Sequence, residues 1–298
     1  MSRLILLFCA IVLVSCGPAQ TQHAQISPSN GMDFKGYWYQ GKAEVASYKL
    51  EQARYGEMRD GHAVLVFVTE DFSQSKQVKL DDPRSAGKDK LPILKLNFVK
   101  KFLTGIYPYS IMQSVFTPVQ VEQYPHSLKT SMSSQEWCGH TYTQFNLQKN
   151  AYRVSRYSYF ESEGDISETL PLALLEDEIW NLIRLAPEQL PTGTQEVIPG
   201  SIYSRLVHRE QVPQKAKLSL SEMEDSFQYS IDYLKDGRSL RIDFAKEFPY
   251  KILGWEESYS NFGRNMTSKA TLMKTLHTAY WSQHGNADLG LRKELGLE

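Results

Sequence analysis

Hydrophobic and polar residues alternate along most of this chain, which is the pattern of β-strands that bury one face. Two Asp-Gly pairs interrupt the alternation, and Asp-Gly supplies the positive φ angles that a tight hairpin turn requires. The two predicted hairpins are 42–58 and 62–71 around Asp60-Gly61, and 227–234 and 238–244 around Asp236-Gly237. Further strands are predicted at 93–102, 109–121, 128–147, 151–161, 195–210, 214–221 and 267–281.

One segment has helical spacing in place of alternation. Its apolar positions are Leu172, Leu175, Ile179, Leu182 and Ile183. Pro171 suits a first helical turn, and Ala186-Pro187 ends the segment. Glu176, Asp177 and Glu178 are then predicted to form the solvent-facing side of this helix. A short helix is also predicted within the tail, 285–298.

These elements predict a mainly β fold, in which an antiparallel curved sheet or half-barrel surrounds one amphipathic helix. That layout resembles the half-barrel of the LolA-like lipoprotein carriers, by analogy of architecture alone. A two-sheet β-sandwich is the alternative. Residues 32–298 are expected to form a single β-rich domain, or two joined halves that meet near 171–194.

The N-terminus carries Arg3 and then an apolar run of eleven residues, Leu4–Val14. Such a run fits the core of a signal peptide and is too short for a bilayer span of roughly 20 residues. It ends in Leu-Val-Ser-Cys, which resembles the lipobox of bacterial lipoproteins. The resemblance implies a signal peptide at 1–15 and acyl chains, such as palmitate, on Cys16. An ordinary secretory signal with an incidental cysteine is the alternative.

Residues 16–31 are small and polar, and they predict a flexible tether that extends at most about 50 Å. The residues after Cys16 are Gly17, Pro18, Ala19 and Gln20, without an Asp or an acidic cluster. Among bacterial lipoproteins this favours the periplasmic face of the outer membrane. The expected partner is therefore a membrane, contacted through the acyl chains.

The net formal charge is −1 with 22% charged residues, which gives no reason to propose a nucleic acid as partner. The stretch 36–43 (GYWYQGKA) approaches a phosphate-binding loop, but Ala43 stands where a hydroxyl should bind magnesium. No nucleotide and no other cofactor are expected. Cys9 lies in the signal and Cys16 takes lipid, so Cys138 has no cysteine left to pair with.

Cys138 lies in Glu136-Trp137-Cys138-Gly139-His140, the most reactive-looking short segment. On one strand over 128–147, Cys138 and His140 share a face at about 6.5 Å. That is long for a thiolate–imidazole hydrogen bond, and no third residue orients His140. The expected role of Cys138 is packing in the core, with a binding or catalytic role as the alternatives.

No catalytic and no metal-ligating residues are assigned. The histidines show no metal-binding spacing, and two ligands at Cys138 and His140 do not make a zinc site. Glu161, Glu163 and Asp165 predict a solvated acidic loop, with weak calcium binding as the alternative. The candidate ligand-binding residues are Trp38, Trp137, Cys138, His140 and Trp255.

Four stretches resemble an uncharacterised lipoprotein family of Bacteroidetes: ARYGEMRDGHAVLVFVTEDF, GIYPYSIMQS, QEWCGH and YKILGWEESY. The resemblance covers nearly the whole mature chain. Members are often called septum formation inhibitor Maf, but genuine Maf proteins are cytoplasmic nucleotide pyrophosphatases with a Ser-Pro-Arg-Arg motif near the N-terminus. This chain lacks the motif, so the resemblance implies no catalytic residues.

Three functions follow as hypotheses. The first is a non-enzymatic envelope binding module for a hydrophobic or cell-wall ligand. The second is a structural or interaction lipoprotein without a ligand, recognised by an exposed apolar patch. The third is an envelope hydrolase that uses Cys138 or carboxylates.

Overall fold

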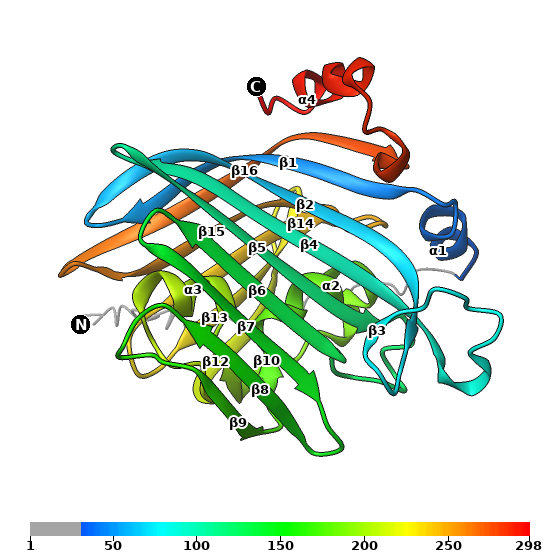
Figure 1. Cartoon of the computed structure of the whole chain (residues 1–298), viewed down its shortest axis with the longest axis horizontal. Coiled ribbons are helices and arrows are strands. Elements are labelled where there is room, and N and C mark those ends of the chain that lie inside the picture. The colour runs from blue at the N-terminus through cyan, green and yellow to red at the C-terminus, as the bar shows by residue number, and fades with distance from the viewer. Residues whose placement is uncertain (1–30) are drawn as a thin grey trace, which may run out of the picture.

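The computed structural model describes residues 31–298, in which sixteen strands form one open, strongly curved sheet (Figure 1). The predicted fold class, a mainly β protein with a curved sheet around a helix, is confirmed. The predicted signal peptide, Cys16 and most of the tether lie outside the described residues.

The strands alternate with few helices along the chain. The helices are α1 (Gly31–Trp38), α2 (Glu176–Leu185), α3 (Ser201–Val207) and α4 (Gly290–Glu294). The strands of the first half are β1 (Ala43–Arg54), β2 (Glu57–Ser73), β3 (Val78–Lys79), β4 (Lys90–Thr104), β5 (Tyr107–Pro118), β6 (Lys129–Glu136), β7 (Gly139–Leu147), β8 (Ala151–Ser158) and β9 (Ile166–Pro171). Those of the second half are β10 (Leu174–Leu175), β11 (Gly193–Ile198), β12 (Gln214–Glu222), β13 (Ser226–Tyr233), β14 (Ser239–Ala245), β15 (Ile252–Asn261) and β16 (Arg264–Thr278).

The sheet is a meander, and the first and last strands of the described chain pair with each other near its centre. Its order is β10-β11-β12-β13-β14-β15-β16-β1-β2-β4-β5-β6-β7-β8-β9, with β3 beside β2. The last strand, β16, pairs antiparallel with the first, β1. The open edges are therefore β9 and β10, which follow each other in sequence.

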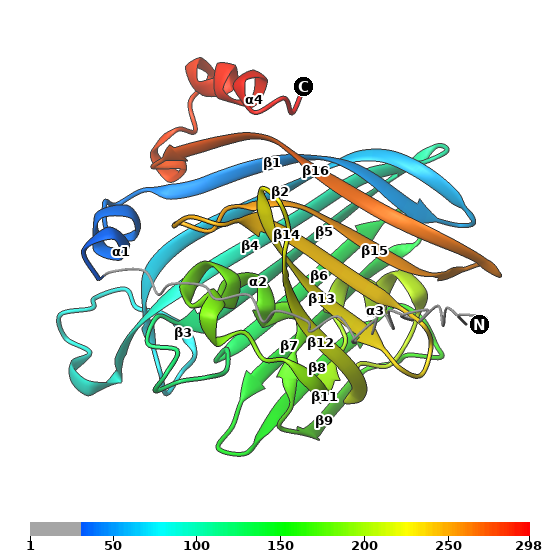
Figure 2. The ribbon, with the colours of Figure 1, turned by 180° about the vertical axis from the view of Figure 1, so that it is seen from behind.

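Six hairpins turn at the same end of the sheet, at the left in Figure 1, and we call this the tip end. They are the turns β1–β2, β4–β5, β6–β7, β8–β9, β13–β14 and β15–β16. The helix α1 lies at the opposite end of β1, and α4 lies on the outer face above β1 and β16 (Figures 1 and 2). Leu295, just after α4, packs with Ala43, Val45 and Val68.

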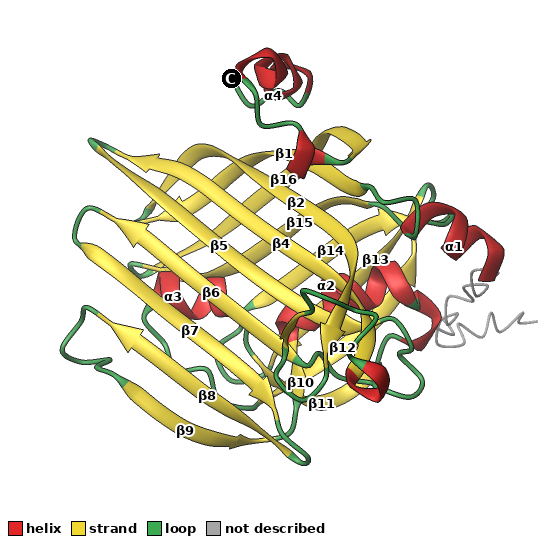
Figure 3. Ribbon diagram, turned by 45° about the vertical axis from the view of Figure 1, so that its right-hand side comes forward, coloured by secondary structure: helices red, strands yellow, loops and turns green. Residues whose placement is uncertain are grey.

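The helix α2 lies inside the curve of the sheet, and α3 lies beside it (Figure 3). All ten residues of α2 are buried, the charged ones included. Trp180 of α2 contacts Phe98 of β4 and Trp255 of β15, with ring centroids 5.2 and 5.3 Å apart. Phe98 and Trp255 also contact each other at 5.1 Å. This aromatic trio joins opposite walls of the sheet through the helix.

Each polar side chain of α2 pairs with the surrounding sheet and loops through at least one atom, and Asn181 Oδ1 is the one buried polar atom of the helix side chains without a partner. Burying them without partners would cost several kcal/mol each. The pairs are Glu176 with Arg238 and Tyr233, Asp177 with Ser201, Glu178 with Ser127 and His126, Asn181 with Leu94 O and Thr117, and Arg184 with Glu44 and Pro249 O. The prediction of a solvent-facing side formed by Glu176, Asp177 and Glu178 was wrong because these carboxylates have partners elsewhere in the chain.

The helix also begins later than predicted. Pro171 is the last residue of β9 and not part of a first helical turn. The carboxylate of Glu178 accepts a hydrogen bond from the Leu175 backbone N–H at 3.0 Å, which fixes the start of α2. The predicted end at Ala186-Pro187 is confirmed, because α2 ends at Leu185.

The predicted turn at Asp60-Gly61 was wrong, whereas that at Asp236-Gly237 is confirmed. The β1–β2 turn is Tyr55-Gly56, with both residues at positive φ. Gly61 lies within β2, where a Cβ atom would stand 2.3 Å from the Lys101 carbonyl oxygen. The glycine therefore permits close approach of strands and does not form the turn.

Two other segments differ from prediction. Residues 128–147 form a hairpin, β6–β7, and not one strand. The predicted strand 195–210 is β11 followed by α3. The tail contains the short helix α4, as predicted. Within residues 31–298, no helix is both long and apolar enough to cross a membrane.

The Glu44–Arg184 pair is expected to contribute strongly to stability. Its guanidinium and carboxylate are fully buried and meet at 2.7 and 2.8 Å. Glu44→Ala should lower the free energy of unfolding by about 3–5 kcal/mol, because it leaves a buried unpaired charge. Glu256→Ala is the control, because it breaks the exposed Lys269 pair and should cost at most about 1 kcal/mol. Equal losses in urea unfolding would contradict this prediction.

The second stability prediction concerns Gly61. Gly61→Ala should lower the free energy of unfolding by about 1–3 kcal/mol, because the new methyl group would collide with the Lys101 carbonyl. In Gly36→Ala the added methyl group meets no atom within 4 Å, so stability should stay within about 1 kcal/mol of the parent. Thermal unfolding of both variants tests this, and an unchanged melting temperature for Gly61→Ala would contradict it.

Candidate functional site

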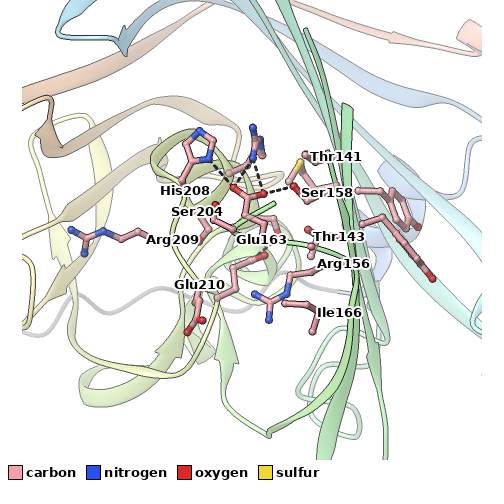
Figure 4. Close-up of a pocket in the computed structure, with 18 residues that line it drawn as sticks. Thr141, Thr143, Arg156, Ser158, Glu163, Ile166, Ser204, His208, Arg209 and Glu210 are labelled. Carbon is pink, nitrogen blue, oxygen red and sulfur yellow. Dashed lines mark hydrogen bonds and ion pairs between the residues drawn. The ribbon is translucent and has the colours of Figure 1, made fainter. Parts of the chain in front are cut away.

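A cavity of about 300 Å³ lies at the tip end, between the strands β7–β9 and the helix α3 (Figure 4). Its wall combines three guanidiniums, two carboxylates, a histidine and several hydroxyl groups. The residues that carry the chemistry are Thr141, Thr143, Arg156, Ser158, Glu163, Ser204, Arg205, His208, Arg209 and Glu210. At this volume the cavity is at the small end of ligand sites.

Glu163 is the centre of the site. Its carboxylate accepts a hydrogen bond from the Ser158 hydroxyl at 2.5 Å and from His208 Nδ1 at 2.7 Å. Arg205 Nη1 lies 3.0 Å from both of its oxygens. Burial alone would raise the pKa of Glu163, but these three partners hold it below the ordinary value. Glu163 is therefore a carboxylate at neutral pH.

The loop that carries Glu163 is held against α3 by ring contacts. The Arg205 guanidinium lies 4.5 Å from the centroid of the Phe160 ring, and the His208 ring meets the same ring edge-on at 5.0 Å. His208 ends α3 in the left-handed conformation, with φ of 54°. The β8–β9 hairpin and the end of α3 thus form one side of the cavity together.

The position of α3 depends on α2. Asp177 accepts hydrogen bonds from the Ser201 backbone N–H at 3.0 Å and from its hydroxyl at 2.5 Å, at the start of α3. At Gly200 a Cβ atom would lie 2.4 Å from Glu176 Oε1, so only glycine permits this approach. The buried charges of α2 therefore determine where Ser204, Arg205 and His208 point.

The other guanidiniums of the cavity are also paired. Arg156 forms an ion pair with Glu168 of β9, and Arg209 forms one with Asp236 in the β13–β14 turn. Each guanidinium of the site thus faces a carboxylate, and this carboxylate reduces the electrostatic attraction of the guanidinium for an anionic ligand.

Three polar atoms of the residues that line the cavity have no hydrogen-bond partner among residues 31–298. They are Thr141 Oγ1, Ser204 Oγ and Arg156 Nε, and all three atoms are buried. A buried polar group without a partner costs about 1–3 kcal/mol of stability. Such groups need an explanation, and a ligand in the cavity that reached them would supply the missing partners.

The structure does not bring together the five candidate ligand-binding residues predicted from the sequence. Trp38 and Trp255 are buried in the main hydrophobic core. Trp137, Cys138 and His140 lie at the β6–β7 turn, outside the cavity described above.

The prediction of a buried Cys138 was wrong, because Cys138 is exposed in a two-residue turn. Its backbone N–H donates to the Glu136 carboxylate at 2.7 Å, and this carboxylate raises the pKa of the thiol. A thiol with a raised pKa is a weak nucleophile at neutral pH. Gly139 is required by packing, since a Cβ atom there would lie 2.7 Å from the ring of Tyr159.

Aromatic side chains connect the hairpins of the tip end, and we call them the tip row: Tyr55, Tyr107, Trp137, Tyr159 and Phe262. Tyr55 contacts the Phe262 ring at 5.7 Å and accepts a hydrogen bond from Tyr107 at 3.2 Å. The ring of Tyr107 lies 6.3 Å from that of Trp137. All except Tyr107 are exposed, so the row is an apolar surface at this end.

Sequence reasoning identified little of the cavity. Glu163 was placed in an acidic loop with Glu161 and Asp165, and the prediction that it is simply solvated was wrong. Its partners Arg205 and His208 follow it by 42 and 45 residues. The close spacing of Arg205, His208, Arg209 and Glu210 is the one local signal of the site in the sequence. Among residues 31–298, no group of three or more potential ligands could hold a metal ion.

Comparisons of the chain with protein-family models, with curated proteins and with solved structures gave no match. The functional argument therefore depends on the geometry of the cavity and on the N-terminal sequence.

The link between Asp177 and α3 predicts a pH dependence of stability. Burial raises the pKa of Asp177 from 3.8 to about 6, although the Ser201 hydrogen bonds oppose this. The folded protein thus holds this proton more tightly than the unfolded chain. This contribution to stability is complete below pH 3.8 and is lost as the pH rises through 6.

Asp177→Asn should remove that loss. Relative to the parent, the variant should gain up to about 3 kcal/mol of unfolding free energy between pH 4 and 7. The gain is about 1.4 kcal/mol for each pH unit between the two pKa values, 3.8 and about 6. Urea unfolding at both pH values measures the difference. A constant difference between parent and variant at the two pH values would contradict the raised pKa.

Proposed function

We propose that this chain is a lipid-anchored envelope protein that binds a ligand non-enzymatically in the cavity between β7–β9 and α3. The observation that carries the proposal is the group of buried, unpartnered polar atoms around this cavity: Thr141 Oγ1, Ser204 Oγ and Arg156 Nε. The core around the aromatic trio is closely packed. A larger cavity of about 530 Å³, lined by Val121, Leu174 and Leu182 among others, has no buried polar atom without a partner among its lining residues.

The anchor part of the proposal rests on the sequence. The apolar run Leu4–Val14 and the Leu-Val-Ser-Cys that ends at Cys16 support acylation of that cysteine. Several acyl chains hold a protein to a membrane more firmly than one chain can. Together with the residues after Cys16, this supports the periplasmic face of the outer membrane. The four stretches quoted from the body of the chain support membership of the Bacteroidetes lipoprotein family that the sequence resembles.

The site chemistry favours binding over catalysis. The Glu163 carboxylate is held by three partners, so it is poorly placed to accept a further proton. Cys138 lies outside the cavity, and Glu136 raises the pKa of its thiol. A hydrolase that uses Cys138 or these carboxylates is therefore less well supported than a binding module.

The tip row favours a second candidate, an interaction lipoprotein that needs no small ligand. Trp137, Tyr159 and Phe262 are 67%, 66% and 72% exposed, and they lie on successive or nearby hairpins. Aromatic residues of this kind are enriched where proteins meet one another. In this candidate the tip row contacts another envelope protein.

Native mass spectrometry on the full chain, purified from its own membranes in mild detergent, tests the first proposal. The expected result is a reproducible extra mass on the protein, retained by a Cys16→Ser form that lacks the anchor. Ser162→Trp, at the exposed mouth of the cavity, should remove this mass because the indole blocks entry. Ser85→Trp, on an exposed loop between β3 and β4, is the matched control and should keep it.

The outcomes separate the two candidates. An extra mass that Ser162→Trp retains, or no extra mass at all, would contradict binding in this cavity. A co-purifying protein that is lost in Trp137→Ser but kept in Ser162→Trp would support the interaction lipoprotein instead.

A further inference from the structure

The charges around the cavity nearly cancel. The guanidiniums are Arg156, Arg205 and Arg209, and the carboxylates are Glu163, Glu168, Glu210 and Asp236. Three positive groups thus face four negative groups, with His208 counted as neutral. A phosphate or a carboxylate would have to compete with the carboxylates for each guanidinium, so the cavity offers an anion little net attraction.

The unpartnered atoms indicate a ligand whose oxygen atoms can form hydrogen bonds with them. Arg156 Nε can only donate a hydrogen bond, whereas the hydroxyls of Thr141 and Ser204 can donate or accept. Glu210, which also lines the cavity, can only accept while it is charged. A matching ligand must therefore offer both acceptors and donors, and it must do so without a net charge.

We infer that the cavity binds an uncharged saccharide, that is, one or two sugar units whose hydroxyl groups both donate and accept hydrogen bonds. This inference rests on the proposed function, because it assigns a ligand class to the same cavity. Pairs of guanidinium and carboxylate suit such a ligand, since a sugar hydroxyl can accept from the first and donate to the second. Met132 and Ile166 add an apolar part to the wall, which suits the C–H faces of a sugar ring.

A ligand of this class gains affinity from groups that the free protein leaves unsatisfied. Thr141 and Ser204 are 5% and 3% exposed, and none of residues 31–298 pairs with their hydroxyl oxygens. The proton of each hydroxyl turns about the Cβ–Oγ bond, so the group can donate to a ligand oxygen or accept from a ligand hydroxyl. Removal of one such hydroxyl should weaken saccharide binding about tenfold, the effect of one hydrogen bond of about 1.4 kcal/mol.

The chain offers a matched pair of variants for this test. Thr141→Val removes an unpartnered buried hydroxyl at the cavity, and Thr130→Val removes an equally buried, unpartnered hydroxyl on β6 that does not line it. Both changes keep the shape of the side chain, so both variants should fold. Only Thr141→Val is expected to lose affinity.

The experiment is a glycan array that carries neutral and acidic mono- and disaccharides, probed with the full chain in mild detergent. Binding to neutral glycans, about tenfold weaker for Thr141→Val and unchanged for Thr130→Val, is the expected result. Binding confined to phosphorylated or carboxylated glycans would overturn the inference, as would no binding or an equal loss in both variants.

The two proposals can fail separately. If native mass spectrometry finds a ligand that Ser162→Trp removes and that ligand is charged or carries no sugar, binding in the cavity stands and the saccharide inference fails. If mass spectrometry finds no ligand in the cavity and no glycan on the array is bound, both the binding proposal and the saccharide inference fail.

Discussion

The burial of charge on α2 is the constraint on which the rest of this structure depends. Every residue of the helix is buried, so Glu176, Asp177, Glu178 and Arg184 each need a partner inside the protein. Those partners come from strands and loops far apart in the sequence, among them Glu44 of β1 and Arg238 in the β13–β14 turn. The helix therefore determines both how the sheet curves and which strands face each other.

The same constraint explains why the cavity lies where it does. The aromatic trio and the ion pairs fill the space around α2, and Asp177 fixes the start of α3. Beyond α3 no such buried helix fills the space, and the sheet edge at β9 is open. The loop that carries Glu163 reaches across to Arg205 and His208 there, and it leaves a small polar cavity with unpaired donors.

Local patterns predicted much of the fold and little of the site. The alternation of residues identified most strands, the spacing of Ile179, Leu182 and Ile183 identified α2, and Asp236-Gly237 identified its turn. Glu176 to Glu178 looked solvated because their partners, such as Arg238 62 residues away, leave no local signal. The hairpin at Trp137-Cys138 was missed since it lacks the usual turn residues.

The helix α3 was missed for a related reason. Its seven residues, SIYSRLV, are too few to show helical spacing, and they also fit the alternation of a strand. The cavity draws its residues from 132 to 211 and depends on this helix, so no single motif could reveal it. What the sequence could supply was the class of protein that it resembles and the type of fold.

Hydrogen exchange of the full chain, followed peptide by peptide, tests the central claim most directly, namely that α2 fixes a well-packed core beside the cavity at α3. The account predicts that the amides of α2 exchange as slowly as the centres of β1 and β2, through global unfolding alone. The segments 160–166 and 208–213, which border the cavity, should exchange much sooner. The account would be contradicted if the amides of α2 exchanged before those of β1 and β2. It would also be contradicted if the two cavity segments were protected as strongly as α2.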